Sequence, residues 1–460
     1  MGGLNTTLNI GVQALDVTEA ALNAASNNIA NANTPGYTRE EPLLTENPES
    51  ITDGQVTGGG VTLDGLQSVR DELLNLQIQQ QTSAQNSADT VSSSLQQVEN
   101  YFSTTGNDIG TELSAFSSAL TELSASPNST SVQQNVLSAG QNLASAFNTT
   151  ANGLTTAQSS ADGQVSQTVS QINSLTTRIA QLNGQVSQLT AAGQDGGTVQ
   201  DQRDELVQQL SALTGVSVAT SSDGETITTG NGTPLVLGDK SFDLQTTTGA
   251  NGFQQVEDSN GNNITSSISG GTLGGAIEVR DQTIPGILNQ LNTLASDFAT
   301  SFNAAQAKGY DSNGNAGQNF FTVPTGTTTG AAASISVALT SSSQIAISSD
   351  AASGSNGNVA NLSDVLTTPL ASGQTPVDAY SSLVFQVGNA ESNASSQSTA
   401  IGDNLTSLTN QQGSISAVSV DEETTNLIRY QTAYEAAARI VSTIQQLNTV
   451  TLDMGTTGGY

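Results

Sequence analysis

The side chains of this chain that could take part in chemistry are mostly carboxylates. The 460 residues include 40 Asp and Glu against 9 Lys and Arg, and they include neither histidine nor cysteine. Histidine is the commonest general base and metal ligand, and thiolates act as nucleophiles and metal ligands. The composition therefore excludes a Ser-His-Asp arrangement, a cysteine nucleophile, a disulfide and a thiolate metal site.

Two loops that begin with aspartate resemble calcium-binding loops only in part. An EF-hand loop needs glycine at its sixth position and glutamate at its twelfth. Counted from Asp311, these positions hold Ala316 and Thr322, and counted from Asp258 the sixth position holds Asn263. We interpret both segments as tight turns and predict neither a metal site nor a cofactor.

The remaining catalytic possibility is a pair of carboxylates, which glycosidases use for general acid and base chemistry. With 40 acidic residues such pairs arise by chance, and aromatic residues make up only 4% of the chain, so none lies in a context suited to sugar rings. We therefore predict that the protein is not an enzyme. The formal net charge of −31 would repel phosphate backbones and anionic membrane surfaces, so no nucleic-acid partner is expected.

The sequence gives no sign of a membrane span or of a cleaved signal peptide. No apolar run reaches the length of a spanning helix, and the N-terminus lacks the basic and apolar regions of a signal peptide. We expect no membrane insertion. These features alone are typical of a cytoplasmic protein, but they also fit a chain exported by a system that reads an uncleaved N-terminus.

Large and small residues alternate in a heptad pattern near the N-terminus. One set recurs every seven residues and a second set follows it by three: Leu8, Leu15, Leu22 and Ile29, then Gly11, Thr18, Ala25 and Ala32. On a helix these positions form one narrow stripe, which is typical of a coiled-coil seam. The pattern stops before Pro35 and Gly36, because proline restricts the residue before it and glycine permits a turn. A helix with so narrow a stripe needs a partner.

The candidate partner lies at the other end of the chain. Ser419 and Glu422 form a capping box that predicts the start of a helix. The heptad sets here are Val420, Leu427, Tyr434 and Val441, then Tyr430, Ala437 and Ile444. We predict that the two end helices pair with each other or with neighbouring subunits. The alternative is that both are ordinary amphipathic helices of one globule.

The residues between the two ends predict a mainly α fold with a β insertion. Helices are expected over 70–102, 113–123 and 132–147. The strongest heptad pattern runs from Val165 to Leu189, and another long one runs from Tyr380 to Ile415. We expect these two segments to pair as the long helices of a rod.

The helical period gives way to short alternating runs and turns from Val216 to Val279. The expected architecture is therefore nested. A terminal coiled-coil assembly domain (1–35 and 420–460) encloses a helical rod-like domain (36–215 and 280–419), which encloses an outer, mainly β domain (216–279).

Four segments carry a resemblance to a known family. Ser26–Arg39, with the sequence SNNIANANTPGYTR, resembles the N-terminal signature of flagellar rod, hook and hook-associated proteins, and Ser419–Leu447 resembles their C-terminal end. Gln202–Ser211 and Gly270–Gly314 are similar to the middle of hook-associated protein 1 and have no counterpart in hook and rod proteins. The chain is thus identified as resembling the hook-associated protein 1 family.

The resemblance departs from the family pattern in three places. Ser68 stands where a basic residue is expected, and Gly455–Tyr460 form a small extra tail. The β insertion carries no family motif, which leaves its outward contacts undefined.

The resemblance implies a structural role in the bacterial flagellum, joining the hook to the filament. It implies a polymer of the chain itself, with the hook protein and a second hook-associated protein as neighbours, and an export chaperone on the C-terminal helix. It also implies an extracellular location, reached through the flagellar type III apparatus without a cleaved signal peptide. The open alternatives are a hook or rod subunit, or a secreted surface adhesin that uses the β insertion.

Two groups of residues are predicted to matter for assembly. The assembly seam comprises Leu8, Leu15, Leu22, Ile29, Leu427, Tyr434, Val441 and Ile444, and the turn motif comprises Asn31, Thr34, Pro35, Gly36 and Tyr37. A short seam bears the cost of helix nucleation without a partner surface. We therefore expect both ends to be mobile in the monomer and to fold when copies assemble.

Overall fold

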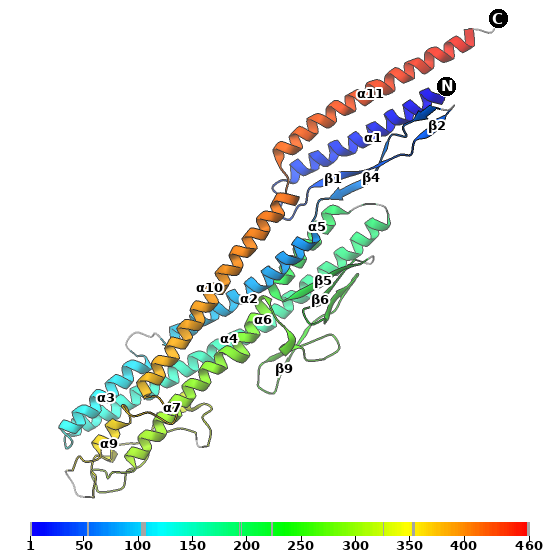
Figure 1. The fold of residues 1–460 in the computed structure, drawn as a ribbon. Coiled ribbons are helices and arrows are strands. Elements are labelled where there is room, and N and C mark those ends of the chain that lie inside the picture. The colour runs from blue at the N-terminus through cyan, green and yellow to red at the C-terminus, as the bar shows by residue number, and fades with distance from the viewer. Residues whose placement is uncertain are drawn as a thin grey trace.

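The computed structural model describes residues 2–52, 55–102, 107–192, 194, 196–221, 224–324, 326–351 and 355–457. These residues form a long molecule with both termini at one end and a small β part on one flank (Figure 1). The predicted fold class, mainly α with a β insertion, is confirmed. Among the described helices, none is both long enough and apolar enough to span a membrane.

Helices make up most of the described chain. They are α1 (Gly2–Asn31), α2 (Glu72–Phe102), α3 (Ile109–Ala125), α4 (Thr130–Ala191), α5 (Gly197–Leu213), α6 (Gly271–Glu278), α7 (Ile284–Gln306), α8 (Ala331–Ser334), α9 (Val359–Asp364), α10 (Pro376–Ser416) and α11 (Val420–Thr457). A π-helical turn over Val279–Thr283 joins α6 to α7, and short 3₁₀ turns occur at Thr265–Ser267 and Ser342–Gln344.

The strands form small antiparallel sheets. They are β1 (Glu40–Glu46), β2 (Ser50–Thr52), β3 (Gln55–Thr57), β4 (Val61–Ser68), β5 (Val216–Ser221), β6 (Gly224–Thr229), β7 (Pro234–Leu237), β8 (Lys240–Ser241), β9 (Gln245–Thr248), β10 (Gln254–Glu257), β11 (Phe321–Thr322) and β12 (Ser336–Val337). The largest sheet has the order β5-β6-β7-β8, and the other pairs are β1-β4, β2-β3, β9-β10 and β11-β12.

The far end of the rod is held by a cluster of aromatic rings. Phe116 of α3 packs against Phe298 and Phe302 of α7 and against Phe320 and Phe321, with ring centroids 5.1 to 6.2 Å from its own. All five side chains are fully buried. Half of the ten phenylalanines of the chain therefore stabilise this one region.

The long helices pair differently from the prediction. The two helical segments expected over 132–147 and 165–189 are parts of one 62-residue helix, α4. Its heptad residues Val165, Ile172 and Ile179 are buried, but they pack in a core shared with α5, α6 and the β sheet. Helix α10 lies along α2 instead (Figure 1). The predicted pairing of the two seams is therefore wrong.

The β insertion ends earlier than the prediction placed it. The sheet residues Ile227, Leu235 and Val236 are buried in a core that they share with α4, so the sheet forms a separate layer on this helix. Residues 271–278, however, form helix α6. Its glycines obscured the helical pattern, and they serve close packing, since a Cβ on Gly275 would lie 2.7 Å from the carbonyl oxygen of Ser87 in α2.

Arg280 joins the β part to the long helix. Its side chain is buried, and its Nη1 lies 2.8 Å from Oδ1 of Asp162 in α4 and 2.6 Å from the carbonyl oxygen of Gln254 in β10. The same Asp162 oxygen accepts the backbone N–H of Gln254 at 2.8 Å. A buried charge is tolerated only when it is paired and hydrogen-bonded in this way.

Candidate functional site

The two ends of the chain form one domain of three layers. Helices α1 and α11 lie side by side and run in opposite directions, and the β1-β4 ribbon covers another side of α1 (Figure 1). A Cβ on Gly11 would lie 2.9 Å from Cγ2 of Val441, and one on Gly60 beside the ribbon would lie 3.3 Å from Ile10. Small residues therefore let both outer layers approach α1 closely. We propose to count the ribbon with the terminal helices, although the predicted domain boundary fell before it.

The structure places the predicted seam residues at different depths. On α1, Leu8, Leu15, Leu22 and Ile29 are all half-buried. On α11, Leu427 and Val441 are half-buried, Ile444 is buried and Tyr434 is 37% exposed. The most buried side chains of α1 are Val17, Ala21, Ala24, Ala25 and Asn28, of which only Ala25 belongs to the predicted heptad sets. The involvement of the predicted seam in assembly stays a prediction.

One buried amide ties the base of the terminal domain together. The Asn28 side chain donates to the carbonyl oxygen of Glu40 at 2.9 Å and to Oε2 of Glu423 at 3.2 Å. Its Oδ1 accepts the backbone N–H of Glu40 at 3.0 Å and the hydroxyl of Tyr37 at 2.9 Å. An amide has two donor hydrogens and two acceptor sites, so every one of them is used. Asn28 thus links α1, the turn, β1 and α11.

The turn motif follows directly. The Thr34 backbone N–H donates to the carbonyl oxygen of Asn31 at 2.8 Å, and its hydroxyl lies 3.2 Å from Asn31 Oδ1. Gly36 has φ +76°, a left-handed conformation that strains other residues. Burial raises the pKa of Tyr37 to about 12, with smaller contributions from carboxylates that include Glu40. Tyr37 therefore remains a hydroxyl donor to Asn28.

The turn is fastened to the helical domain by charged groups. The backbone N–H of Thr38 donates to Oδ2 of Asp201 in α5 at 3.0 Å, and Oδ1 of Asp201 lies 2.7 Å from Nη2 of Arg70. Arg70 also pairs with Asp204 at 2.9 Å. Burial raises the pKa of Asp201, against the lowering effect of the Thr38 N–H and Arg70.

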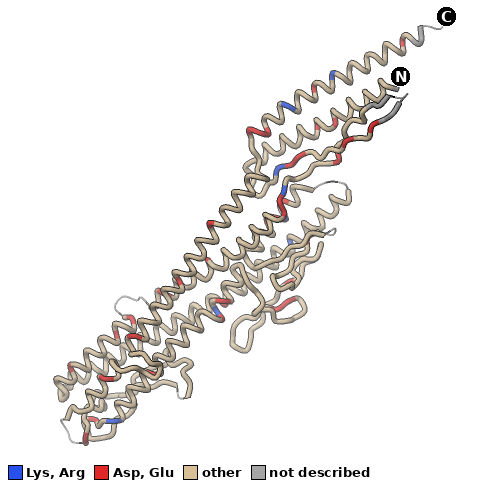
Figure 2. The backbone as a smooth tube through the Cα atoms, viewed as in Figure 1, with Lys and Arg blue, Asp and Glu red and all other residues tan. Residues whose placement is uncertain are grey.

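Two further arginines extend this charged group. Arg203 lies 3.0 Å from Asp204 and 2.8 Å from Glu225 of β6, while Arg39 lies 3.6 Å from Glu422 at the start of α11. Three of the nine Lys and Arg residues of the chain therefore sit at this joint. Figure 2 colours Lys and Arg blue and shows blue segments at the base of the terminal domain. Burial raises the pKa of Glu225 to about 7, although Arg203 opposes the shift.

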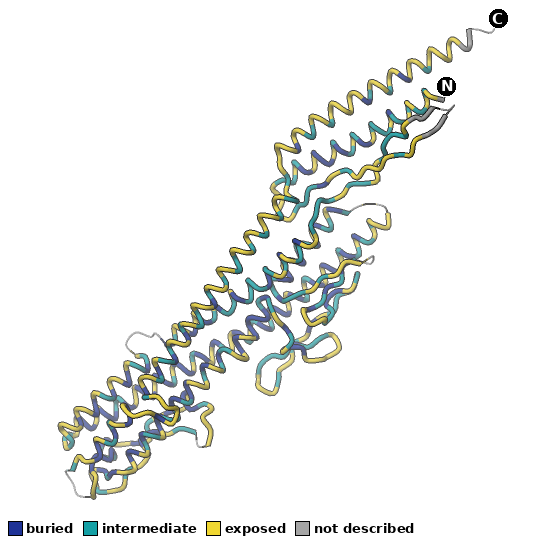
Figure 3. Tube along the Cα trace, viewed as in Figure 1, coloured by how far each residue is buried: buried dark blue, intermediate teal, exposed yellow. Residues whose placement is uncertain are grey.

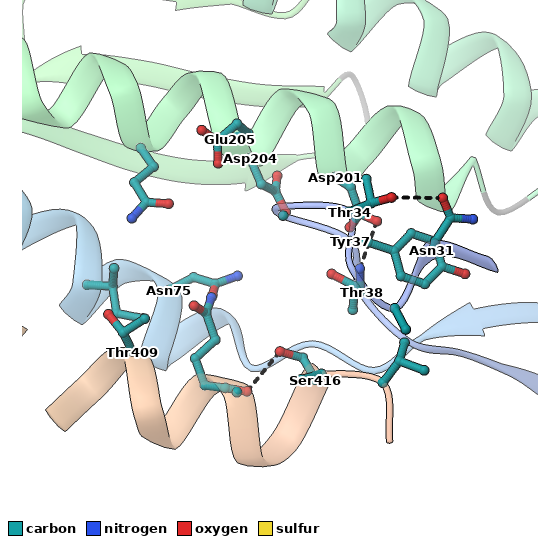
Figure 4. Close-up of a pocket in the computed structure, with 18 of the residues that line it drawn as sticks. Asn31, Thr34, Tyr37, Thr38, Asn75, Asp201, Asp204, Glu205, Thr409 and Ser416 are labelled. Carbon is teal, nitrogen blue, oxygen red and sulfur yellow. Dashed lines mark hydrogen bonds between the residues drawn. The ribbon is translucent and has the colours of Figure 1, made fainter. Parts of the chain in front are cut away.

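A polar cavity of about 380 Å³ lies at the joint between the turn, α2, α5 and α10 (Figure 4). Its labelled lining residues are Asn31, Thr34, Tyr37, Thr38, Asn75, Asp201, Asp204, Glu205, Thr409 and Ser416. Among the residues that the structure describes, no three acidic side chains are grouped so as to hold a metal ion. The arrangement positions one domain on another.

The two aspartate loops use their carboxylates internally. Oδ1 of Asp311 accepts the backbone N–H groups of Asn313 and Asn315, both at 2.8 Å. Oδ1 of Asp258 accepts those of Asn260 and Asn262 in the same way. These hydrogen bonds lower the pKa of both aspartates. Such bonds are what a tight turn requires.

Sequence reasoning missed the residues that close this joint. Asn28 sits among the buried small residues of α1, where no apolar repeat marks it. Glu423 is one of three acidic residues in the first turn of α11, where acids are favourable for the helix dipole alone. Asp201 and Arg70 come from segments 131 residues apart. A single sequence contains no signal that pairs such distant groups.

Asn28→Asp should loosen the terminal domain. The change removes both donor hydrogens and places a carboxylate beside buried Glu423, which should cost roughly 3 kcal/mol in the pairing of α1 with α11. Hydrogen exchange of the amides of both helices measures the effect. Asn27→Asp, at the exposed neighbouring position, is the control. Equal exchange in the two variants would show that the Asn28 network does not hold the helices.

Glu225→Gln should remove a dependence of stability on pH. The carboxyl has an ordinary pKa of 4.5, and about 7 in the folded chain. Between these values the folded state binds the proton more tightly than the unfolded state does, so the free energy of unfolding falls as pH rises. Urea unfolding from about pH 5 to about pH 8 should show wild type losing stability relative to the variant. A difference that does not change with pH would contradict this assignment.

Comparisons with known proteins agree with the layout of the chain. A family model described as the flagellar hook-associated protein FlgK helical domain matches residues 95–321. Models described as the flagellar basal body rod FlgEFG protein C-terminal and as the flagella basal body rod protein match 411–454 and 8–38. The last two ranges cover most of α11 and α1.

Curated relatives match along nearly the whole chain. Flagellar hook-associated protein 1 of Bacillus subtilis (strain 168) is 32% identical, over 95% of this chain and 95% of its own length. Its namesake from Escherichia coli (strain K12) is 26% identical, over 96% of this chain and 98% of its own. The flagellar hook junction protein FlgK from Burkholderia pseudomallei has the same fold, with a TM-score of 0.67 at 19% identity over 74% of this chain and all of that chain. The chain belongs to the flagellar hook-associated protein 1 family.

Proposed function

We propose that copies of this chain assemble through their terminal domains and that the assembly links the flagellar hook to the filament. Membership of the family makes the chain a structural component of the external flagellum, at the hook–filament junction. The family model for the helical domain selects hook-associated protein 1 over a hook or rod subunit. The adhesin alternative gains no support from the β insertion, which packs largely on α4.

The observation that carries the proposal is a side of α11 with several exposed apolar side chains. Ile440, Leu447 and Met454 are seven residues apart, Val450 lies between them, and all four are 49% to 66% exposed. Figure 3 shows α11 as mostly exposed along its length. A continuous exposed apolar stripe of this kind marks a protein interaction site. We name these four residues the outer stripe of α11.

The pairing of α1 with α11 leaves most apolar side chains only half-buried, which supports folding coupled to assembly. Among the residues of α11 whose burial the structure describes, Ala437 and Ile444 are the buried apolar ones. Burying one large apolar side chain contributes about 1.5–3 kcal/mol. So small a gain offsets little of the entropy of ordering two long helices. Both ends are therefore expected to stay mobile in the monomer until a neighbouring copy covers the outer stripe.

The partners follow from the same surface. An export chaperone that covers the outer stripe in the cytoplasm would keep copies apart before export through the flagellar apparatus. Once outside, the stripe is free to contact further copies, and the two open ends of a ring would meet the hook protein and a second hook-associated protein. The seam and turn residues would then set the orientation of the helical domain around the axis.

Substituting the outer stripe should block assembly. In Ile440→Asp/Leu447→Asp two carboxylates replace apolar contacts, so the variant should remain monomeric at concentrations where wild type polymerises, and it should fail to restore filament attachment in a strain that lacks the gene. The change lies on an exposed face, so the fold should be kept. Sedimentation velocity and counts of attached filaments measure the two effects.

The control is Phe385→Asp, which puts the same charge on an exposed apolar site of α10. It should assemble like wild type. Normal polymerisation of the α11 double variant would contradict the proposal.

A further inference from the structure

The β1-β4 ribbon carries a second apolar surface that the fold leaves open. Leu43, Leu44 and Leu63 are 36% to 47% exposed, although they lie in a ribbon whose other side packs on α1. The register explains this arrangement. Leu43 pairs with Gly65 and Leu44 with Leu63, so Asp64 is an extra residue that forms a bulge. A bulge breaks the alternation of a strand, and here two successive leucines are exposed.

The ribbon is acidic, and α11 supplies cations near the outer stripe. The segment 40–68 contains six acidic residues and no Lys or Arg. Helix α11 contains Arg429 and Arg439 and five acidic residues. Arg439 directly precedes the outer stripe, whose span from Ile440 to Met454 includes one acid, Asp453. Arg439 is exposed beside Ile440 and forms no ion pair with another described residue. In a chain of net charge −31, contact between copies is favoured where these few cations meet acids.

The two surfaces also match in length. From Ile440 to Met454 a helix rises about 21 Å, at about 1.5 Å per residue. The seven residues of β1 span about 20 Å, at about 3.3 Å per residue. Helix α1 lies between α11 and the ribbon, so neither surface can cover the other within one protomer (Figure 1).

We propose that the outer face of the β1-β4 ribbon of one copy packs against the outer stripe of α11 in the neighbouring copy. The contact joins two different surfaces of the same domain, and such head-to-tail contacts generate rings or helical rows rather than closed dimers. Leu43, Leu44 and Leu63 supply the apolar contact, while Glu46 and Asp64 face the arginines of α11. This inference rests on the proposed self-assembly and names the surfaces that perform it.

The absence of cysteine from the chain makes this contact directly testable. Two single variants, Leu43→Cys and Leu447→Cys, are purified separately, mixed, allowed to assemble and oxidised. The mixture should give a disulfide-linked dimer that neither variant gives alone. The double variant Leu43→Cys/Leu447→Cys should give a ladder of covalent oligomers. Leu43→Cys mixed with Phe385→Cys, at an exposed apolar site on α10, is the control and should stay unlinked.

Sedimentation of the same samples measures polymer formation, and so it distinguishes a wrong contact from a failure of self-assembly. Polymers that form without a link above the control would overturn this contact and leave the proposed function standing. Samples that neither polymerise nor link would overturn both.

Charge reversal gives an independent measurement. Arg439→Glu should raise the concentration needed for assembly by about tenfold or more, because like charges then face each other. Adding Glu46→Arg and Asp64→Arg in the same chain should restore assembly. Arg178→Glu, at an exposed position of α4, should leave assembly unchanged. A triple variant no better than Arg439→Glu alone would contradict the contact.

Discussion

The antiparallel pairing of α1 with α11 is the contact on which the rest of the structure depends. It brings together two segments that stand at opposite ends of 460 residues, as the Asn28–Glu423 hydrogen bond shows. Everything between them must therefore leave the terminal domain and return to it. This requirement produces the nested order along the sequence. The rod segments lie between the two terminal helices, and the β segment lies between the rod segments. In space the β part lies on one flank of the rod (Figure 1). The Asn28 amide binds α1 to the start of α11 and to β1, near the point where the chain leaves α1.

The two ends of the molecule are stabilised in different ways. The far end of the rod holds five packed phenylalanine rings and a large apolar core. The terminal domain instead packs small residues against half-buried leucines, and it relies on an amide and a few arginines at its base. A thin interface of this kind leaves apolar surface on both outer layers. That surface is what a subunit of a polymer needs.

Heptad spacing in the sequence predicted most of the helices but not their neighbours. The terminal seams, α3 and the long seams of α4 and α10 all follow from apolar spacing. Apolar spacing shows which side of a helix is buried but not which element buries it. The heptad pattern of α10 was therefore predicted to pair with α4. Its actual neighbour α2 buries apolar residues near both ends but Thr82, Ser83, Ala88 and Ser92 along its middle, so no continuous apolar repeat marks it. For the same reason most of the buried stripe of α1, which ends in Asn28, was not predicted, although Ala25 of the heptad pattern lies in it.

The most direct measurement is hydrogen exchange along the chain, made on the purified monomer and on the assembled polymer. In the monomer, amides of Leu4–Ala32 and Val420–Leu452 should exchange fast, while those of α4 from Val165 to Leu189 should exchange slowly. In the polymer, both terminal segments should become protected. Strong protection of both ends in a proven monomer would show that α1 and α11 are already stable without a neighbour, and assembly-coupled folding would be contradicted.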